Sequence, residues 1–276
     1  MSEDEVFILF ICFAVSLFGW FNWYRRLIYF WPSCLGKKNR IWLGVMPIIC
    51  MFSMFTVLSS QASYDVVDST VYIFFYIIFG MAWLILGRLI MTTLFDISWL
   101  DDAIERNNKS AVFVVSGSII GLTAVYSGAN IGDGPGWWCV LIAGGLATIV
   151  WFLLFGLLQI VCDISERITI ERNTATGIRI AFYMVSSGII LGRGAAGDWT
   201  STMDTIIELF DAWPVLILFG VAIFVEKWFM WQEKNGYENE HIYSSLFWGF
   251  TYLLLAIIIL VLSPPLPTNP IYSFLL

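Results

Sequence analysis

The chain has few charged residues and almost no histidine. Of its 276 residues only 13% are charged, and its one histidine is His241. A zinc site built from Cys and His, an acidic calcium loop and a histidine acid-base pair are therefore not expected. The sequence also lacks a glycine-rich phosphate loop and a nucleophile elbow, and the adjacent Asp101 and Asp102 are interpreted as a polar loop. We expect no enzyme, no cofactor and no metal.

Basic patches with interleaved aromatic residues are missing as well, which argues against nucleic acid binding. The one short basic stretch, from Arg25 to Arg40, is interpreted as a contact for anionic lipid headgroups. No disulfide framework is expected from the five scattered cysteines, which are Cys12, Cys34, Cys50, Cys139 and Cys162.

Long apolar runs dominate what is present. Apolar side chains make up 59% of the chain, and the mean hydropathy is +0.81. Runs of roughly 20 residues are long enough to cross the hydrocarbon core of a bilayer. The sequence predicts an all-α polytopic membrane protein with about eight transmembrane helices. The predicted spans are Val6 to Tyr24, Ile41 to Ser60, Val71 to Leu94, Ser110 to Ser127, Trp137 to Val161, Thr174 to Gly192, Trp213 to Phe229 and Tyr243 to Leu262.

Loop charges predict the orientation. When the loops are assigned alternately to two sides, eleven of the fourteen Lys and Arg fall on one side and only Arg193 on the other. Basic loops stay in the cytoplasm, so both termini are expected outside it. The outer side holds ten acids, which would attract cations: Glu3, Asp4, Glu5, Asp65, Asp68, Asp133, Asp198, Asp204, Glu208 and Asp211.

Two stretches about 66 residues apart resemble each other. Asp96-Ile97-Ser98 and Asp163-Ile164-Ser165 each end a span, and Ile-Glu-Arg-Asn follows at residues 104–107 and 170–173. Each copy holds two spans, which predicts a parallel tandem repeat. The predicted organisation is an N-terminal hairpin (1–70), a first repeat (71–130), a second repeat (131–198), and an outer amphipathic helix with a C-terminal hairpin (199–276).

This duplicated pattern resembles a bacterial inner-membrane family called domain of unknown function 350 (YjfL-like), over roughly Val71 to Gly192. The resemblance implies a bacterial inner membrane and two such modules, and it implies no established reaction. The family pattern has Gly-Asn where this chain has Arg106-Asn107 and Arg172-Asn173.

Asn107 and Asn173 stand just before the fourth and sixth spans, where an Asn side chain can cap the first helical turn. The alternative is a polar cluster at a cytoplasmic mouth, symmetric across the two repeats. Its members would be Glu105, Arg106, Asn107, Glu171, Arg172 and Asn173.

Glycine pairs recur at a spacing of four in these two spans, as Gly117 with Gly121 and Gly188 with Gly192. This spacing lets another helix approach closely, so the two spans are expected to pack on each other or on equivalent partners. The same faces could join copies of the chain in a homo-oligomer.

Arg179 and Arg88 lie inside spans six and three, where an unpaired guanidinium costs several kcal/mol. Each could snorkel to the headgroups, or face the bundle with Asp96, Asp163 or Glu226 as counter-ion. Glu226 is also interpreted as the end of span seven. Outside the bilayer, residues 200–211 predict an amphipathic helix that rests on the lipid or covers the bundle as a lid.

Two functions remain open. One is a channel or transporter for small cations or polyamines, which predicts a polar path. The other is a non-catalytic scaffold or subunit of a membrane assembly, which predicts a dry, closed bundle. Spans three to six contain no Asp or Glu near their centres, and transport is placed first by analogy with other duplicated hairpin families.

Overall fold

The computed structural model describes residues 1–30, 36–236 and 242–265. Among these residues it contains no strand and eight helices that are long and apolar enough to cross a membrane, which confirms the predicted class and number of spans. These helices are α1 (Glu3–Tyr29), α2 (Lys37–Leu58), α4 (Thr70–Phe95), α5 (Lys109–Gly128), α6 (Trp137–Cys162), α8 (Thr174–Gly194), α10 (Val215–Lys234) and α11 (Ile242–Leu262).

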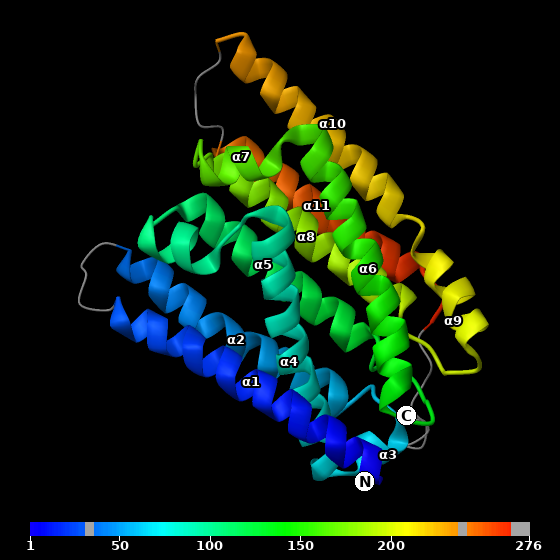
Figure 1. Cartoon of the computed structure of the whole chain (residues 1–276). Coiled ribbons are helices and arrows are strands. Elements are labelled where there is room, and N and C mark those ends of the chain that lie inside the picture. Colours follow the sequence, from blue (N-terminus) through cyan, green and yellow to red (C-terminus); the bar gives the residue numbers. More distant parts are fainter. Residues whose placement is uncertain (31–35, 237–241, 266–276) are drawn as a thin grey trace.

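Shorter helices connect the spans at the two ends of the bundle. They are α3 (Tyr64–Val67), the π-helix η1 (Trp99–Glu105), α7 (Ile164–Thr169), α9 (Thr202–Leu209) and the 3-10 helix η2 (Phe210–Ala212). We call the end with η1 and α7 the basic end, and the end with α3 and α9 the acidic end. The N-terminus lies at the acidic end (Figure 1). Parts of the basic stretch from Arg25 to Arg40 and of the loop with His241 lie outside the described residues.

Helices α5 and α8 form the centre of the molecule, side by side (Figure 1). They are parallel, because Gly177 lies against Ser110 near the basic end and Gly192 lies against Ala124 near the acidic end. In both helices 83% of the most apolar window is buried, compared with 22% in α1 and α11. The other spans therefore shield this central pair from lipid.

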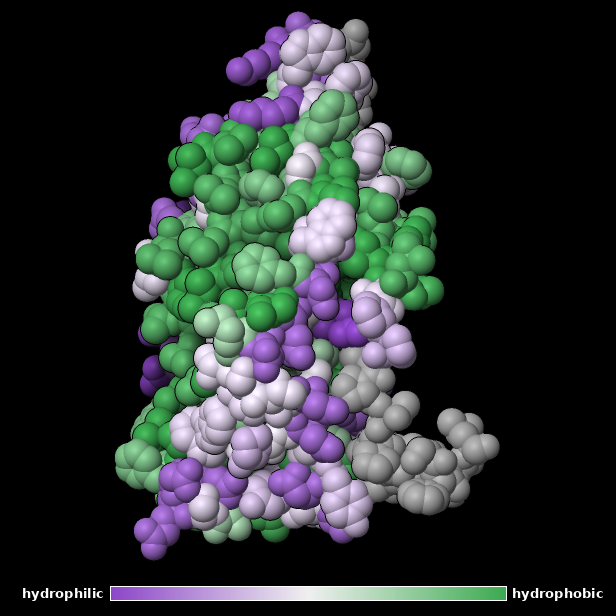
Figure 2. Space-filling view, turned by 90° about the vertical axis from the view of Figure 1, so that its right-hand side faces the viewer, coloured by the Kyte–Doolittle hydropathy of each residue, from purple (hydrophilic) through white to green (hydrophobic). Residues whose placement is uncertain are grey.

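The outer helices pack in two groups. Helix α1 lies against α4 and α2 against α5, while α11 lies against α8 and α10 against both α6 and α8. Their lipid-facing side chains are large and apolar, for example Phe18, Leu153 and Phe224. Figure 2 shows such side chains gathered in a belt, with hydrophilic side chains above and below it. A belt of this kind is what the hydrocarbon core of a bilayer requires.

Helix α9 confirms the predicted amphipathic helix. It begins after Ser201, whose Oγ accepts a hydrogen bond from the backbone N–H of Asp204 at 3.1 Å. Ile206 and Leu209 line an apolar groove that Leu191 of α8 also lines. The helix thus covers part of the acidic end.

The seventh span was predicted too short. Glu226 lies in the middle of α10 rather than at its end, since the helix continues to Lys234. Polar side chains in the last turn do not stop a helix, because its backbone hydrogen bonds stay within the segment. Glu233 in this extension is moreover held by Arg167 of α7.

Candidate functional site

A buried ion pair joins α8 to α10. Arg179 Nε donates to Glu226 Oε1 at 2.6 Å, and Nη2 donates to Oε2 at 2.7 Å. Both side chains are 1% exposed. This two-bond geometry matches the flat guanidinium to the carboxylate and is among the strongest polar contacts in proteins. Snorkelling of Arg179 was therefore the wrong alternative, and Glu226 is its counter-ion.

Further contacts complete the shell of Arg179. Nη1 donates to Ser245 Oγ of α11 at 2.6 Å, and Nη2 also lies 3.2 Å from Thr176 Oγ1. The guanidinium carbon lies 4.0 Å from the centre of the Phe229 ring, a cation–π contact. Three helices thus meet at one charged side chain.

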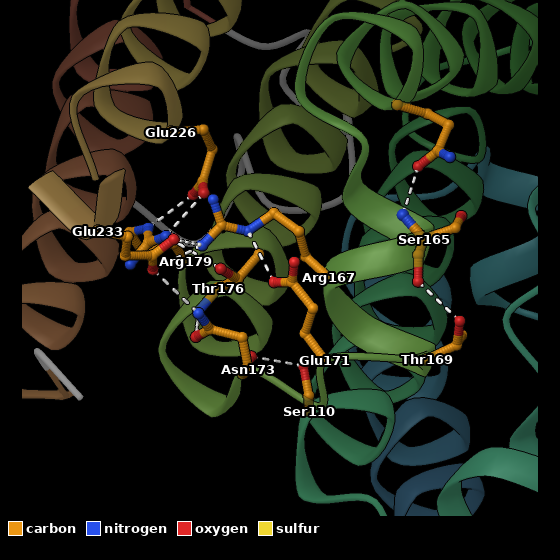
Figure 3. Close-up of polar contacts among 11 residues, drawn as sticks. Ser110, Ser165, Arg167, Thr169, Glu171, Asn173, Thr176, Arg179, Glu226 and Glu233 are labelled. Atoms are coloured by element: carbon orange, nitrogen blue, oxygen red, sulfur yellow. Dashed lines mark hydrogen bonds and ion pairs between the residues drawn. The ribbon is translucent and has the colours of Figure 1, made fainter. Parts of the chain in front are cut away.

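The polar contacts continue toward the basic end (Figure 3). Arg167 Nη2 donates to both oxygens of Glu233, at 2.7 and 2.8 Å, and Asn173 Nδ2 donates to Glu233 Oε1 at 3.1 Å. Asn173 also caps α8, because its Oδ1 accepts from the backbone N–H of Thr176 at 3.0 Å. The predicted cap at Asn173 is confirmed, and the same residue links α8 to the end of α10.

Toward the acidic end, hydroxyl groups follow on the same face of α8. Arg179, Tyr183 and Ser186 are spaced by four and three residues, which places them in one row along a helix. The hydroxyls of Tyr183, Ser186 and Tyr252 of α11 are buried and have no hydrogen-bond partner among the described residues. Tyr252 lies close enough to Arg179, Glu226 and Tyr183 to interact electrostatically with each.

We call this row the polar seam, defined by Thr176, Arg179, Tyr183, Ser186, Glu226, Ser245 and Tyr252. It runs on the side of α8 opposite to α5, since Gly177, Ala181 and Gly188 make the α5 contacts. Beyond the seam, Ile190 and Arg193 of α8 line a cavity of about 340 Å³ at the acidic end.

The lining of this cavity includes acids that the sequence predicts to lie on the outer side. Asp198, Glu208 and Asp211 line it together with Arg193. Partial burial and the charges of Asp204, Asp211 and Asp198 raise the pKa of Glu208 above its usual value. Three acids that are distant in sequence, Asp65, Asp133 and Asp198, line a neighbouring depression. Within the described residues, the acids and cysteines form no cluster able to hold a metal ion.

Arg88, the other charge inside a span, lies in an aromatic site near the basic end. Its guanidinium carbon is 5.3 Å from the Trp23 ring and 5.1 Å from the Trp99 ring. Asp96 and Asp163, expected as counter-ions, instead end α4 and α6 with left-handed backbones at φ 53° and 50°. Neither acid is the counter-ion of Arg179.

The cap of α5 is one residue later than predicted. Asn108 accepts hydrogen bonds from the backbone N–H groups of Ser110 and Ala111, at 3.0 and 3.4 Å. Asn107 has a left-handed backbone at φ 49°, and its Oδ1 accepts from Asn39 at 2.7 Å. Because η1 is a π-helix with one more residue per turn, the loop before α5 has a different register from the loop before α8.

The structure does not form the symmetric cluster of six loop residues. Arg106 pairs with Asp102 at 2.9 Å, and Glu171 lies 3.9 Å from Arg167, which Glu233 holds. Arg172 is exposed and has a left-handed backbone at φ 55°. Of the two predicted halves of the cluster, only the loop that follows α7 contacts the network of Arg167 and Glu233. Glu105 is exposed and takes no part in that network.

Glycines bring α5 and α8 into backbone contact. A Cβ on Gly188 would lie 2.4 Å from the carbonyl oxygen of Gly121, and one on Gly117 would lie 2.6 Å from the Cα of Ala181. A Cβ on Gly192 would lie 2.4 Å from the carbonyl oxygen of Ala124. All four glycines of the two pairs thus lie between these helices, as one of the two predicted arrangements requires.

Sequence reasoning missed most of the seam. Ser245 and Tyr252 of the seam, and Glu233 beyond it, were not selected because the last hairpin was left outside the core. Tyr183 of α8 was not selected either. One signal was available: Glu226 and Glu233 are seven residues apart, so they share a face of α10. Tyr183 and Ser186 continue the row of Arg179 in the same way.

Comparison with known proteins finds one matching family model. No curated protein and no solved structure matches the chain. A family model described as Domain of Unknown Function (DUF350) matches residues 65–195, which include α4 to α8 and the Arg179 side of the seam. This match supports the assignment that the sequence motifs indicated. Residues 65–195 thus match the DUF350 family model, and the eight apolar helices mark the chain as a multi-pass membrane protein.

Proposed function

We propose that this protein carries a small cation across the bilayer along the polar seam between α8, α10 and α11. One observation carries the proposal: a buried Arg179–Glu226 pair is continued by three hydroxyl groups that have no partner in the described part of the chain. Polar groups inside a membrane are expensive, so their alignment in one row favours a pathway. Transport requires a polar path, which a dry bundle lacks.

The surroundings of the seam support the same proposal. Its acidic end leads to the cavity with Asp198, Glu208 and Asp211, which would concentrate cations. At the basic end of the seam, Asn173 accepts from the backbone N–H of Thr176 and donates to Glu233. We further propose that the protein acts in the bacterial inner membrane with both termini outside the cytoplasm.

A non-catalytic scaffold or assembly subunit is the second candidate. Two observations favour it. Glycines bring α5 and α8 into direct contact, which leaves no open path between them, and each nitrogen of the Arg179 guanidinium has a hydrogen-bond partner. A satisfied ion pair can act simply as a pin between helices. In this case the exposed helix faces would bind other copies or other membrane subunits.

Flux of monovalent cations, protons included, and of polyamines into liposomes tests the proposal. The purified full chain is compared with empty liposomes and with Tyr252→Phe, which removes a seam hydroxyl while keeping the ring. Tyr126→Phe is the matched control, since Tyr126 is buried in α5 and its hydroxyl donates to the Tyr76 carbonyl at 2.5 Å, away from the seam.

Uptake above empty liposomes that falls in Tyr252→Phe and persists in Tyr126→Phe is the expected result. If both variants retain the uptake, the cation does not pass along the seam. Folded protein without flux of any tested cation, protons included, under either polarity of the membrane potential would overturn transport and favour the scaffold.

A further inference from the structure

We infer that the cation carried along the polar seam is the proton, and that Glu226 is the group that binds it. This inference rests on the proposed function and names its substrate. The seam contains a carboxylate and hydroxyl groups in one row, at Glu226, Tyr252, Tyr183 and Ser186. A hydroxyl can donate and accept a hydrogen bond at once. The three hydroxyls do not bond to one another or to Glu226 among the described residues, so a relay along the row requires each side chain to turn toward the next.

A metal cation fits the seam poorly. Selectivity filters replace the hydration shell of an ion with a ring of oxygen atoms. Here both oxygens of Glu226 are already bound by Arg179. The guanidinium would also repel any cation that passed it, and buried charges at short distance interact strongly. A proton avoids this difficulty because it binds to Glu226 itself and neutralises a charge there.

The groups facing Glu226 come from three helices. Arg179 of α8 forms the ion pair, Tyr252 of α11 is within electrostatic reach, and Cys162 of α6 lies on the third side. Glu226 is the only carboxylate among these groups. If Glu226 takes up a proton and loses its charge, Arg179 needs another acidic partner.

Glu233 offers that second partner, because its two oxygens, which accept from Arg167 and Asn173, can each accept a further hydrogen bond. It lies two turns beyond Glu226 on the same face of α10, with Phe229 between them. Arg179 already interacts electrostatically with Glu233.

When the hydroxyl of Tyr252 passes a proton to Glu226, its own O–H bond breaks as the O–H bond on Glu226 forms, and the next hydroxyl in the row returns a proton to Tyr252. The protonated oxygen of Glu226 then gives up the hydrogen bond that it accepted from Arg179. The guanidinium then turns toward Glu233, and release of the proton restores the original pair.

Proton flux and metal-cation flux are measured side by side in the same proteoliposomes of the full chain. A dye reports the internal pH under an imposed pH gradient, with the membrane potential clamped, and labelled sodium and rubidium are followed in a parallel arm. The variants are Tyr252→Phe, Tyr183→Phe and Glu226→Gln, with Tyr126→Phe as the matched control. Monodisperse elution in detergent selects the folded variants, and the two phenylalanine variants suffice if Glu226→Gln does not fold.

The expected result is proton flux well above that of empty liposomes, lowered about tenfold by either phenylalanine variant at the seam and unchanged in Tyr126→Phe. Sodium or rubidium flux without proton flux would contradict the inference that the proton is the substrate, but it would still support the proposed transport function. Proton flux that the seam variants do not lower would overturn the role of the seam. Absence of all flux would remove the proposed function as well.

Discussion

Arg179 and Glu226 form an ion pair that is buried inside the bundle. Each oxygen of Glu226 accepts a hydrogen bond from Arg179, and both side chains are removed from solvent. Desolvation of the two charges offsets much of their attraction, so the pair adds little net stability. The loss of one partner is different, because it leaves the other charge buried and unpaired.

Arg179→Met is therefore expected to lower the stability of the folded protein by about 3–5 kcal/mol. The double variant Arg179→Met with Glu226→Met should recover much of that loss, since it leaves no buried charge. Thermal unfolding in detergent, followed by the loss of monodisperse protein, measures both. A single variant as stable as the parent chain would show that Glu226 finds another partner or binds a proton without cost.

Helices α5 and α8 approach so closely that no side chain fits between them. The nearest contacts are backbone atoms, at Gly121 for Gly188 and at Gly192 for Gly128. Backbone cannot move aside as the end of a flexible side chain can. Packing at this distance also lets dispersion contacts hold the helices together, which lipid does not otherwise favour.

Gly188→Ala is expected to push α5 and α8 apart and to lower the thermal stability in detergent by several degrees. Gly220→Ala is the matched control. Gly220 lies within α10 with nothing near its missing Cβ, so alanine should leave stability unchanged or slightly higher. Equal stability of the two variants would contradict the close approach of the central helices.

If all eight helices cross the membrane, the start of α1 and the end of α11 lie on one side, and the acidic and basic ends lie on opposite sides. Cysteine labelling in intact cells tests which side is which. Asp68→Cys and Asp204→Cys at the acidic end should react with an impermeant thiol reagent, while Arg106→Cys and Lys234→Cys should react only after the membrane is opened. The four native cysteines in the described residues are buried, so they should add little background. The reverse labelling pattern would invert the orientation expected from the loop charges.

Much of this architecture was predictable because hydrophobicity along the chain is a strong signal. Span number, the capping role of Asn173 and the amphipathic helix at residues 202–209 follow from local pattern, and the structure confirms them. The cap of α5 was predicted at Asn107 and lies at Asn108, because the sequence does not show that η1 is a π-helix. The tandem repeat stays a prediction, although Asp96 and Asp163 share the same left-handed backbone.

The membrane class and the helical spans were determined by the sequence, since the length and apolarity of a segment decide whether it can cross a bilayer. Only the tertiary structure decided that Arg179 meets Glu226, 47 residues away. Contacts between helices depend on how each helix is rotated, and a span that is apolar on most sides carries little information about its rotation. The seam therefore emerged when α8, α10 and α11 were brought together.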